Sequence, residues 1–143
     1  MKIVDTNVLL YAVDEESPHH LAARAWLEEQ LSGSETFAFS WAVLLAFVRL
    51  ATNPRVFETP LSIEAAFDLV DSWLAQPATT VVHPLDRHHQ LLRELLAPLG
   101  TAANLTSDAH LAALSIEHGA ELCSADSDFA RFPRVRWINP LAA

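Results

Sequence analysis

The sequence predicts an α/β fold: a single domain, residues 1–143, built on a mainly parallel sheet of about five strands. Short apolar segments of strand length alternate along the chain with longer segments of helical periodicity. Such alternation favours a parallel sheet that is covered by helices on both faces. A chain of 143 residues has the size of one ordinary domain and can bury an independent core.

Five segments have the length and composition of strands. The first is Ile3-Val4, which we expect to continue through residues 8–10 after a break at the polar turn of residues 5–7. The other four expected strands are residues 37–39, 79–82, 120–123 and 135–138.

Helix signals fill the intervals between these strands. Ser17 and Pro18 have the pattern of an N-cap followed by a first-turn proline, Ser40 precedes an apolar helical segment, and Gly119 stands where a C′ glycine ends a helix. The expected helices are residues 18–31, 41–52, 62–75 and 87–97, and a last one that ends at His118 and is capped by Thr106 or Ser107.

The composition narrows the classes of function. The formal net charge of −9 has the wrong sign for a protein that holds nucleic acid by bulk electrostatics alone. Cys123 is the single cysteine, and Asp5 interrupts the N-terminal segment before any long apolar stretch forms. We therefore expect a cytoplasmic protein with no internal disulfide, no signal peptide and no association with a membrane.

Three segments end an apolar run on an aspartate. They place Asp5 near the start of the chain, Asp108 in the last third, and Asp126 with Asp128 shortly after the fourth expected strand. In a parallel sheet, strand ends and the following helix starts gather along one edge, so these carboxylates are expected to meet. Uncompensated carboxylates repel one another, and a hard divalent cation such as Mg²⁺ relieves that repulsion and also binds phosphate. The pattern predicts a metal-dependent phosphodiesterase.

Each of these aspartates also has a purely structural interpretation. Asp5 suits an N-cap or Asx turn, Asp108 complements the positive end of its helix, and Asp126 and Asp128 are ordinary turn residues. For each aspartate alone, the structural interpretation is a serious alternative. The functional interpretation is strengthened because three separate segments would each have to place an aspartate at the same edge of the sheet.

Histidines and tryptophans are expected to be structural. No histidine has the spacing of a zinc motif, and His110, although it lies within a turn of Asp108, is expected to be a surface residue. The four tryptophans are expected to belong to the core: Trp26, Trp41, Trp73 and Trp137.

Taken in order, the sequence blocks resemble a PIN-domain ribonuclease of the VapC toxin type, over nearly the whole chain. The resemblance begins with Val4-Asp5-Thr6-Asn7-Val8-Leu9 and continues through Leu50-Ala51-Thr52-Asn53-Pro54-Arg55. It ends with Asp108-Ala109-His110-Leu111 and Ser124-Ala125-Asp126-Ser127-Asp128-Phe129. A lone Asp-Thr-Asn start is a weak signal, whereas all blocks in this order are a strong one.

The resemblance implies a three-layer α/β/α sandwich and endonucleolytic cleavage of RNA that depends on Mg²⁺ or Mn²⁺. It assigns catalysis and metal binding to Asp5, Asp108 and Asp126, adds Asp128 as an outer metal ligand, and puts the hydroxyls of Thr6 and Ser124 near the metal. It further implies a homodimer that acts as the toxin of a toxin–antitoxin pair. The cognate VapB-like antitoxin would block the cleft with its C-terminal tail.

One position departs from the family pattern. The helix after the second strand usually carries a glutamate, and the alignment puts Ala46 there, with no acidic residue elsewhere in that helix. Loss of one carboxylate is expected to weaken metal binding and to lower, but not abolish, activity.

Two alternatives remain open. The first is a catalytically impaired PIN-fold module that docks antitoxin or RNA without cutting, which Ala46 supports. The second is a phosphoaspartate switch or phosphatase on a similar sheet. The latter is disfavoured because residue 7 is Asn rather than a second acid, and because Lys2 is the sole lysine.

Overall fold

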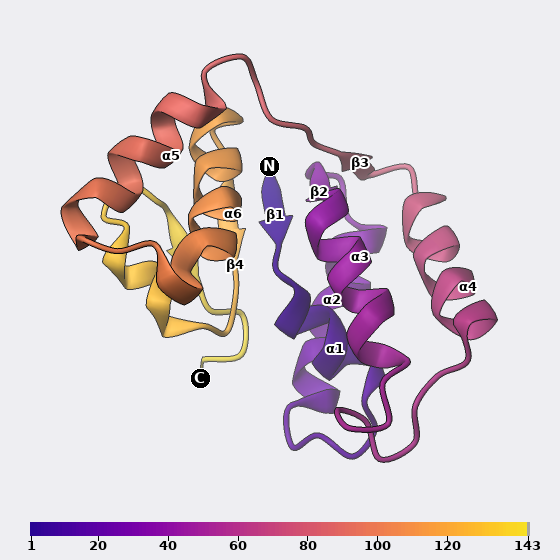
Figure 1. Ribbon diagram of the computed structural model, residues 1–143. Helices are drawn as coiled ribbons and strands as arrows, with labels where there is room; N and C mark the ends of the chain where they lie inside the picture. The colour runs from indigo at the N-terminus through magenta and orange to yellow at the C-terminus, as the bar shows by residue number, and fades with distance from the viewer. Residues whose placement is uncertain (143) are drawn as a thin grey trace.

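A five-stranded parallel sheet forms the centre of the molecule, in the order β3-β2-β1-β4-β5 (Figure 1). The computed structural model describes residues 1–142. Every neighbouring pair of strands is parallel, which confirms the sheet type expected from the sequence. The strands are β1 Lys2–Val4, β2 Phe37–Phe39, β3 Thr79–Val81, β4 Glu121–Cys123 and β5 Trp137–Ile138.

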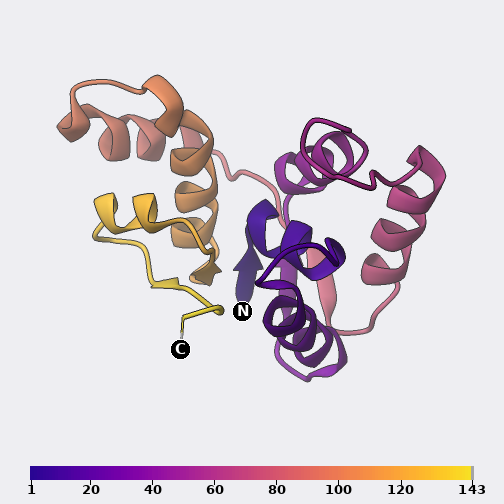
Figure 2. The same cartoon turned by 90° about the horizontal axis from the view of Figure 1, so that it is seen from below.

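Helices cover both faces of this sheet. In the two views, α3, α5 and α6 gather on one face and α2 lies on the other, which confirms the three-layer α/β/α sandwich (Figures 1 and 2). The helices are α1 Thr6–Val13, α2 His20–Ser32, α3 Trp41–Ala51, α4 Ile63–Leu74, α5 His88–Leu96 and α6 Thr106–Glu117. Three short 3₁₀ segments complete the secondary structure: η1 Ala97–Leu99, η2 Ala103–Leu105 and η3 Ser127–Arg131.

The central strands are short but deeply buried. Ile3, Val4 and Leu122 are fully buried, and Phe37 and Phe39 of β2 are at most 1 % exposed. Because both faces of these strands meet apolar side chains, their sequences are continuously apolar rather than alternating. This packing fixes the carboxyl ends of β1 and β4 side by side.

The expected continuation of the first strand through residues 8–10 is wrong. The chain turns into α1 directly after β1, and Val8 and Leu9 are buried in that helix. Asp5 is the N-cap residue, with extended backbone angles, and its Oδ1 accepts a hydrogen bond of 2.7 Å from the backbone N–H of Thr6. A short apolar run suits a buried strand and a buried helix equally, so periodicity alone could not separate them.

The remaining helix boundaries agree with the sequence within about three residues, and the caps expected at Ser40 and Gly119 are confirmed. The cap expected at Ser17 is wrong, because α2 begins at His20 and its N-cap His19 makes no side-chain hydrogen bond. The Ser40 and Ser62 side chains accept hydrogen bonds from the backbone N–H groups of Val43 and Ala65, and Gly119 adopts the left-handed φ of 61°. The cap expected for the last helix is wrong, because η2 leads straight into α6 and the N-cap position is occupied by Leu105.

Two further features concern exposure. Trp73 is buried between Phe39 and Phe47, as expected, whereas Trp41 is 47 % exposed and does not belong to the core. Among residues 1–142, we find no helix of the length and hydropathy needed to cross a bilayer.

Candidate metal centre at the carboxyl edge of the sheet

Two neighbouring strands bring the first and last thirds of the chain together. Val4 of β1 is in register with Cys123 of β4, and the backbone N–H of Asp5 donates to the Cys123 carbonyl at 2.9 Å. Asp5 therefore leaves β1 at the same edge at which Ser124 leaves β4. The convergence that the sequence analysis expected is a direct result of this parallel pairing.

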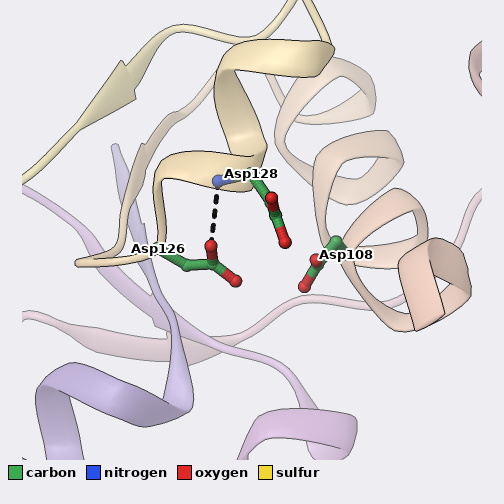
Figure 3. Close-up of side chains that lie close together, drawn as sticks. All are labelled: Asp108, Asp126 and Asp128. Carbon is green, nitrogen blue, oxygen red and sulfur yellow. Dashed lines mark hydrogen bonds between the residues drawn. The ribbon is translucent and has the colours of Figure 1, made fainter.

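Three carboxylates converge beside this edge. One carboxylate oxygen from each of Asp108, Asp126 and Asp128 lies within 4.8 Å of the other two. Asp108 comes from the first turn of α6, and Asp126 and Asp128 come from the start of η3, so the side chains face one another from two elements (Figure 3). All three are half-buried. Oxygen ligands at this spacing can surround one hard cation.

Asp126 is held by the backbone around it. Its Oδ1 accepts a hydrogen bond from the Asp128 N–H at 2.8 Å, which makes it the N-cap of η3. Its own N–H donates to Ser124 Oγ at 3.0 Å. The structural turn role considered for this residue is thus real, and its carboxylate also faces Asp108 (Figure 3).

Asp5 lies outside the group of three and belongs to a hydrogen-bond network with Ser124 and Asn7. The buried Ser124 hydroxyl donates to Asp5 Oδ2 at 2.7 Å, and Asn7 Nδ2 donates to Ser124 Oγ at 3.1 Å. Asn7 Oδ1 accepts from the Ala125 N–H at 3.2 Å, which ties the start of α1 to the turn after β4. The structure therefore brings all four predicted acids to one edge. Asp5 is linked to the group of three through Ser124, whose hydroxyl contacts both Asp5 and the Asp126 N–H.

The electrostatics of the edge disfavour four bare charges. Burial, reinforced by the charges of Asp126, Asp5 and Asp128, raises the pKa of Asp108 to about 6. Burial also raises the pKa of Asp5, while the hydrogen bonds from Ser124 and Thr6 oppose that rise and the charge of Asp126 adds to it. A cation among these groups would remove the repulsion. Both the donor set and its charge therefore fit a divalent metal ion.

Sequence reasoning missed the part played by Asn7, which it treated only as the absence of a second acid. Its position two residues after Asp5, at the start of a helix, was the available signal. The hydroxyl of Thr6, which the resemblance places near the metal, donates to the Val43 carbonyl at 3.5 Å. Ala46 is half-buried on α3, a helix without acidic residues, so α3 adds no carboxylate to the edge.

The expectation that His110 is a surface residue is wrong. His110 is half-buried and its Nδ1 lies 2.9 Å from Nε2 of the buried His88. On its other side, His88 Nδ1 lies 2.6 Å from Glu117 Oε1. His110 and Glu117 both belong to α6, so His88 of α5 bridges two positions on the helix that carries Asp108.

Comparisons with known proteins agree with this fold. The family model described as "PIN domain" matches residues 2–135. The chain is 53 % identical to Ribonuclease VapC37 of Mycobacterium tuberculosis (strain ATCC 25618 / H37Rv) over 142 residues, which cover 99 % of each protein. It is 41 % identical to Ribonuclease VapC33 of the same strain over 141 residues, again with 99 % of each covered.

Solved structures support the fold at much lower identity. A chain of the VapBC2 structure from Rickettsia felis, bound to a DNA fragment from its promoter, superposes with a TM-score of 0.71 at 19 % identity and covers 96 % of this chain and 97 % of that one. A chain of VapBC-1 from nontypeable Haemophilus influenzae gives a TM-score of 0.70 at 14 % identity, with 99 % and 98 % covered.

The fold and the extent of the family match define the class of protein, an α/β domain of the PIN type with an acidic centre. Within that class, the sequence identity to named ribonucleases along the whole chain indicates the subgroup. The chain belongs to the PIN-domain family and, within it, to the VapC ribonucleases.

Proposed function

We propose that this protein is a metal-dependent endoribonuclease that acts as the toxin of a VapBC-type toxin–antitoxin pair. The observation that carries the proposal is the convergence of Asp108, Asp126 and Asp128 within 4.8 Å, beside Asp5, in a chain that is 53 % identical to a named ribonuclease over 99 % of its length. Hydrolysis of a phosphodiester needs charge stabilisation at the phosphate, and such a centre can supply it.

Asp108, Asp126 and Asp128 would hold Mg²⁺ or Mn²⁺. Asp5 lies close enough for its negative charge to act on Asp108 and so to attract the same ion. When bound, such an ion would activate a water and offset negative charge on the phosphate that is being cleaved. The chain's own part is to fix the donors. Ser124 positions Asp5 through its hydroxyl, and the N–H of Asp128 positions Asp126. Both contacts are made before any ligand arrives, so the acids are preorganised.

The proposed partners of this protein, an antitoxin and RNA, are those expected of a VapC ribonuclease. The superposed chains come from complexes described as VapBC, which supports an antitoxin of the VapB kind for this protein as well. A basic antitoxin segment would be attracted to the carboxylate edge and would compete there with RNA. A homodimer and a cytoplasmic location stay predictions from the family resemblance and the composition.

The non-cutting binding module gains no support from the relatives. These proteins are named ribonucleases, and the chain matches them over nearly their whole length. Ala46 therefore bears on the strength of metal binding rather than on the existence of activity. A glutamate at this position would supply the carboxylate that the family usually carries in this helix, in addition to the four acids already present.

The test is cleavage of total cellular RNA by purified protein in Mg²⁺, in Mn²⁺ and in EDTA, with Asp5→Asn, Asp108→Asn and Ala46→Glu run in parallel. We expect discrete metal-dependent fragments from the wild type, no fragments from either Asn variant, and cleavage at lower metal concentration by Ala46→Glu. Asp71→Asn, which alters an exposed acid of α4, is the matched control and should cut like the wild type. Fragments that persist in EDTA or in both site variants would contradict the proposal.

A further inference from the structure

Trp41 differs from the other three tryptophans in the contacts that its indole ring makes. Trp26 meets Phe37 edge-on, Trp73 packs between two phenylalanines, and the indole N–H of Trp137 donates to the Ser124 carbonyl at 2.9 Å. Within residues 1–142, Trp41 has neither an aromatic neighbour nor an indole hydrogen bond, and it is 47 % exposed. A large exposed indole without a partner is typical of a recognition surface.

The position of Trp41 follows from the sheet register. Ile3 of β1 pairs with Ala38 of β2, and the two parallel strands lead on to Asp5 and Ser40, the extended N-cap residues of α1 and α3. Neighbouring strands are separated by about 4.8 Å, and Trp41 is the residue after Ser40. The first turn of α3 thus begins one strand away from Asp5, at the edge that carries the carboxylates.

Leu45 and Arg49 continue an exposed stripe from Trp41 along α3, with spacing of four residues. Leu45 is 60 % exposed and Arg49 is exposed as well. Arg49 forms no ion pair or side-chain hydrogen bond with any of residues 1–142, although the protein carries twice as many acids as bases. The stripe, defined as Trp41, Leu45 and Arg49, therefore presents an aromatic face, an aliphatic side chain and a free cation in line.

We propose, on the basis of the ribonuclease function proposed above, that this stripe binds the unpaired nucleotides next to the phosphate that is cut. Trp41 stacks on one exposed base, and Arg49 contacts a backbone phosphate farther from the metal centre. Eight residues of helix span about 12 Å, which matches the reach of a short stretch of single strand. Stacking on an aromatic side chain combined with a cationic backbone contact is how single-stranded nucleic acid is held, whereas a duplex hides its bases from an indole.

The two side chains predict two separate binding signatures. The probe is a short fluorescein-labelled oligoadenylate, measured by fluorescence anisotropy in EDTA and again in Ca²⁺ over a range of salt concentrations. Trp41→Ala is expected to raise the Kd about tenfold with an unchanged salt dependence, and Trp41→Phe to restore most of the affinity. Arg49→Gln is expected to reduce the slope of log Kd against log salt by about 0.7, the loss of one phosphate contact to a single strand.

Matched controls separate these effects from changes in folding. Phe67→Ala removes an aromatic side chain of α4 that is 43 % exposed, and Arg93→Gln removes an exposed arginine of α5. Both should bind the probe like the wild type. Equal melting temperatures for all variants would show that the fold is retained.

Wild-type affinity in Trp41→Ala together with an unchanged salt slope in Arg49→Gln would overturn the inference. So would a change from dimer to monomer in Trp41→Ala with unchanged affinity, because the stripe would then be a contact between two copies of the chain. If the wild type fails to cut cellular RNA but both signatures appear, the ribonuclease proposal fails and the binding stripe stands. If it cuts RNA and neither signature appears, only the stripe fails.

Discussion

Ionisation of Asp108 is opposed by burial and by three neighbouring carboxylates, which raise its pKa from 3.8 to about 6. Between these two values, the folded protein binds more protons than the unfolded chain does. In EDTA, the free energy of unfolding should therefore fall as the pH rises from about 4 to about 6 and then level off with respect to this group. Urea unfolding monitored by circular dichroism across this interval measures the slope.

Asp108→Asn carries no titratable group at this position, so it should lose most of that slope and be more stable than the wild type at neutral pH without metal. An unchanged slope in Asp108→Asn would show that the pH dependence originates elsewhere. Saturating Mg²⁺ should flatten the slope of the wild type, because a bound cation stabilises the ionised carboxylate.

Ser124 has a different influence, because its hydroxyl lowers the pKa of Asp5 against the effect of burial. Ser124→Ala should weaken metal binding or RNA cleavage about 10- to 100-fold, as expected for a group that orients a ligand, and should move the rising limb of the pH–rate profile to higher pH. The matched control is Ser115→Ala, a buried serine whose hydroxyl donates to the Ala112 carbonyl within α6. It should leave the pH profile unchanged.

The identity of the acids could be predicted from the sequence, but their arrangement could not. Each aspartate follows an apolar run, and parallel topology sends such positions to one edge. The sequence does not contain the distances that make Asp108, Asp126 and Asp128 one group and that leave Asp5 bonded to Ser124. Those distances depend on side-chain rotamers and on the register of β1 against β4, which only the packed core determines.

The contact between α5 and α6 depends on a buried polar bridge. His88 is 9 % exposed and lies between Glu117 and His110, so its removal leaves Glu117 and His110 without their hydrogen-bond partner. His88→Ala should lower the free energy of unfolding by on the order of 2 kcal/mol, measured by urea denaturation. The adjacent His89 is exposed, and His89→Ala should change stability by less than about 0.5 kcal/mol. Equal effects of the two substitutions would contradict the bridge.

The sequence located all five strands and five of the six helices, and the one element of the wrong type was α1, part of which was expected to be strand. Segments such as Ile63–Leu74 carry three turns of periodicity and a serine cap, so both the type and the start of the element are apparent. The strands are two or three residues long, too short for any period to show. That is why residues 8–10 were assigned to a strand, and why the exposure of Trp41, which depends on what packs against α3, could not be predicted from the pattern.

Metal should stabilise the whole molecule, because the acidic centre joins α6 to the turn after β4 and exists only in the folded state. Saturation at 100 times the Kd adds about 2.7 kcal/mol to the free energy of unfolding, which raises the melting temperature by several degrees. Differential scanning calorimetry with and without Mn²⁺ measures this shift. Asp126→Asn should abolish most of it, whereas Asp68→Asn, in an exposed acid of α4, should not.

The pairing of β1 with β4 also determines the order in which the acidic centre can be assembled during synthesis. Lys2 pairs across the sheet with Glu121, which is made much later, and Asp126 follows later still. At 5–20 residues per second, about 6 to 24 seconds of synthesis separate Asp5 from Asp126. Throughout that interval the nascent chain carries Asp5 without its partner acids. The order of the strands therefore keeps the proposed ribonuclease inactive until both halves of its centre have been synthesised.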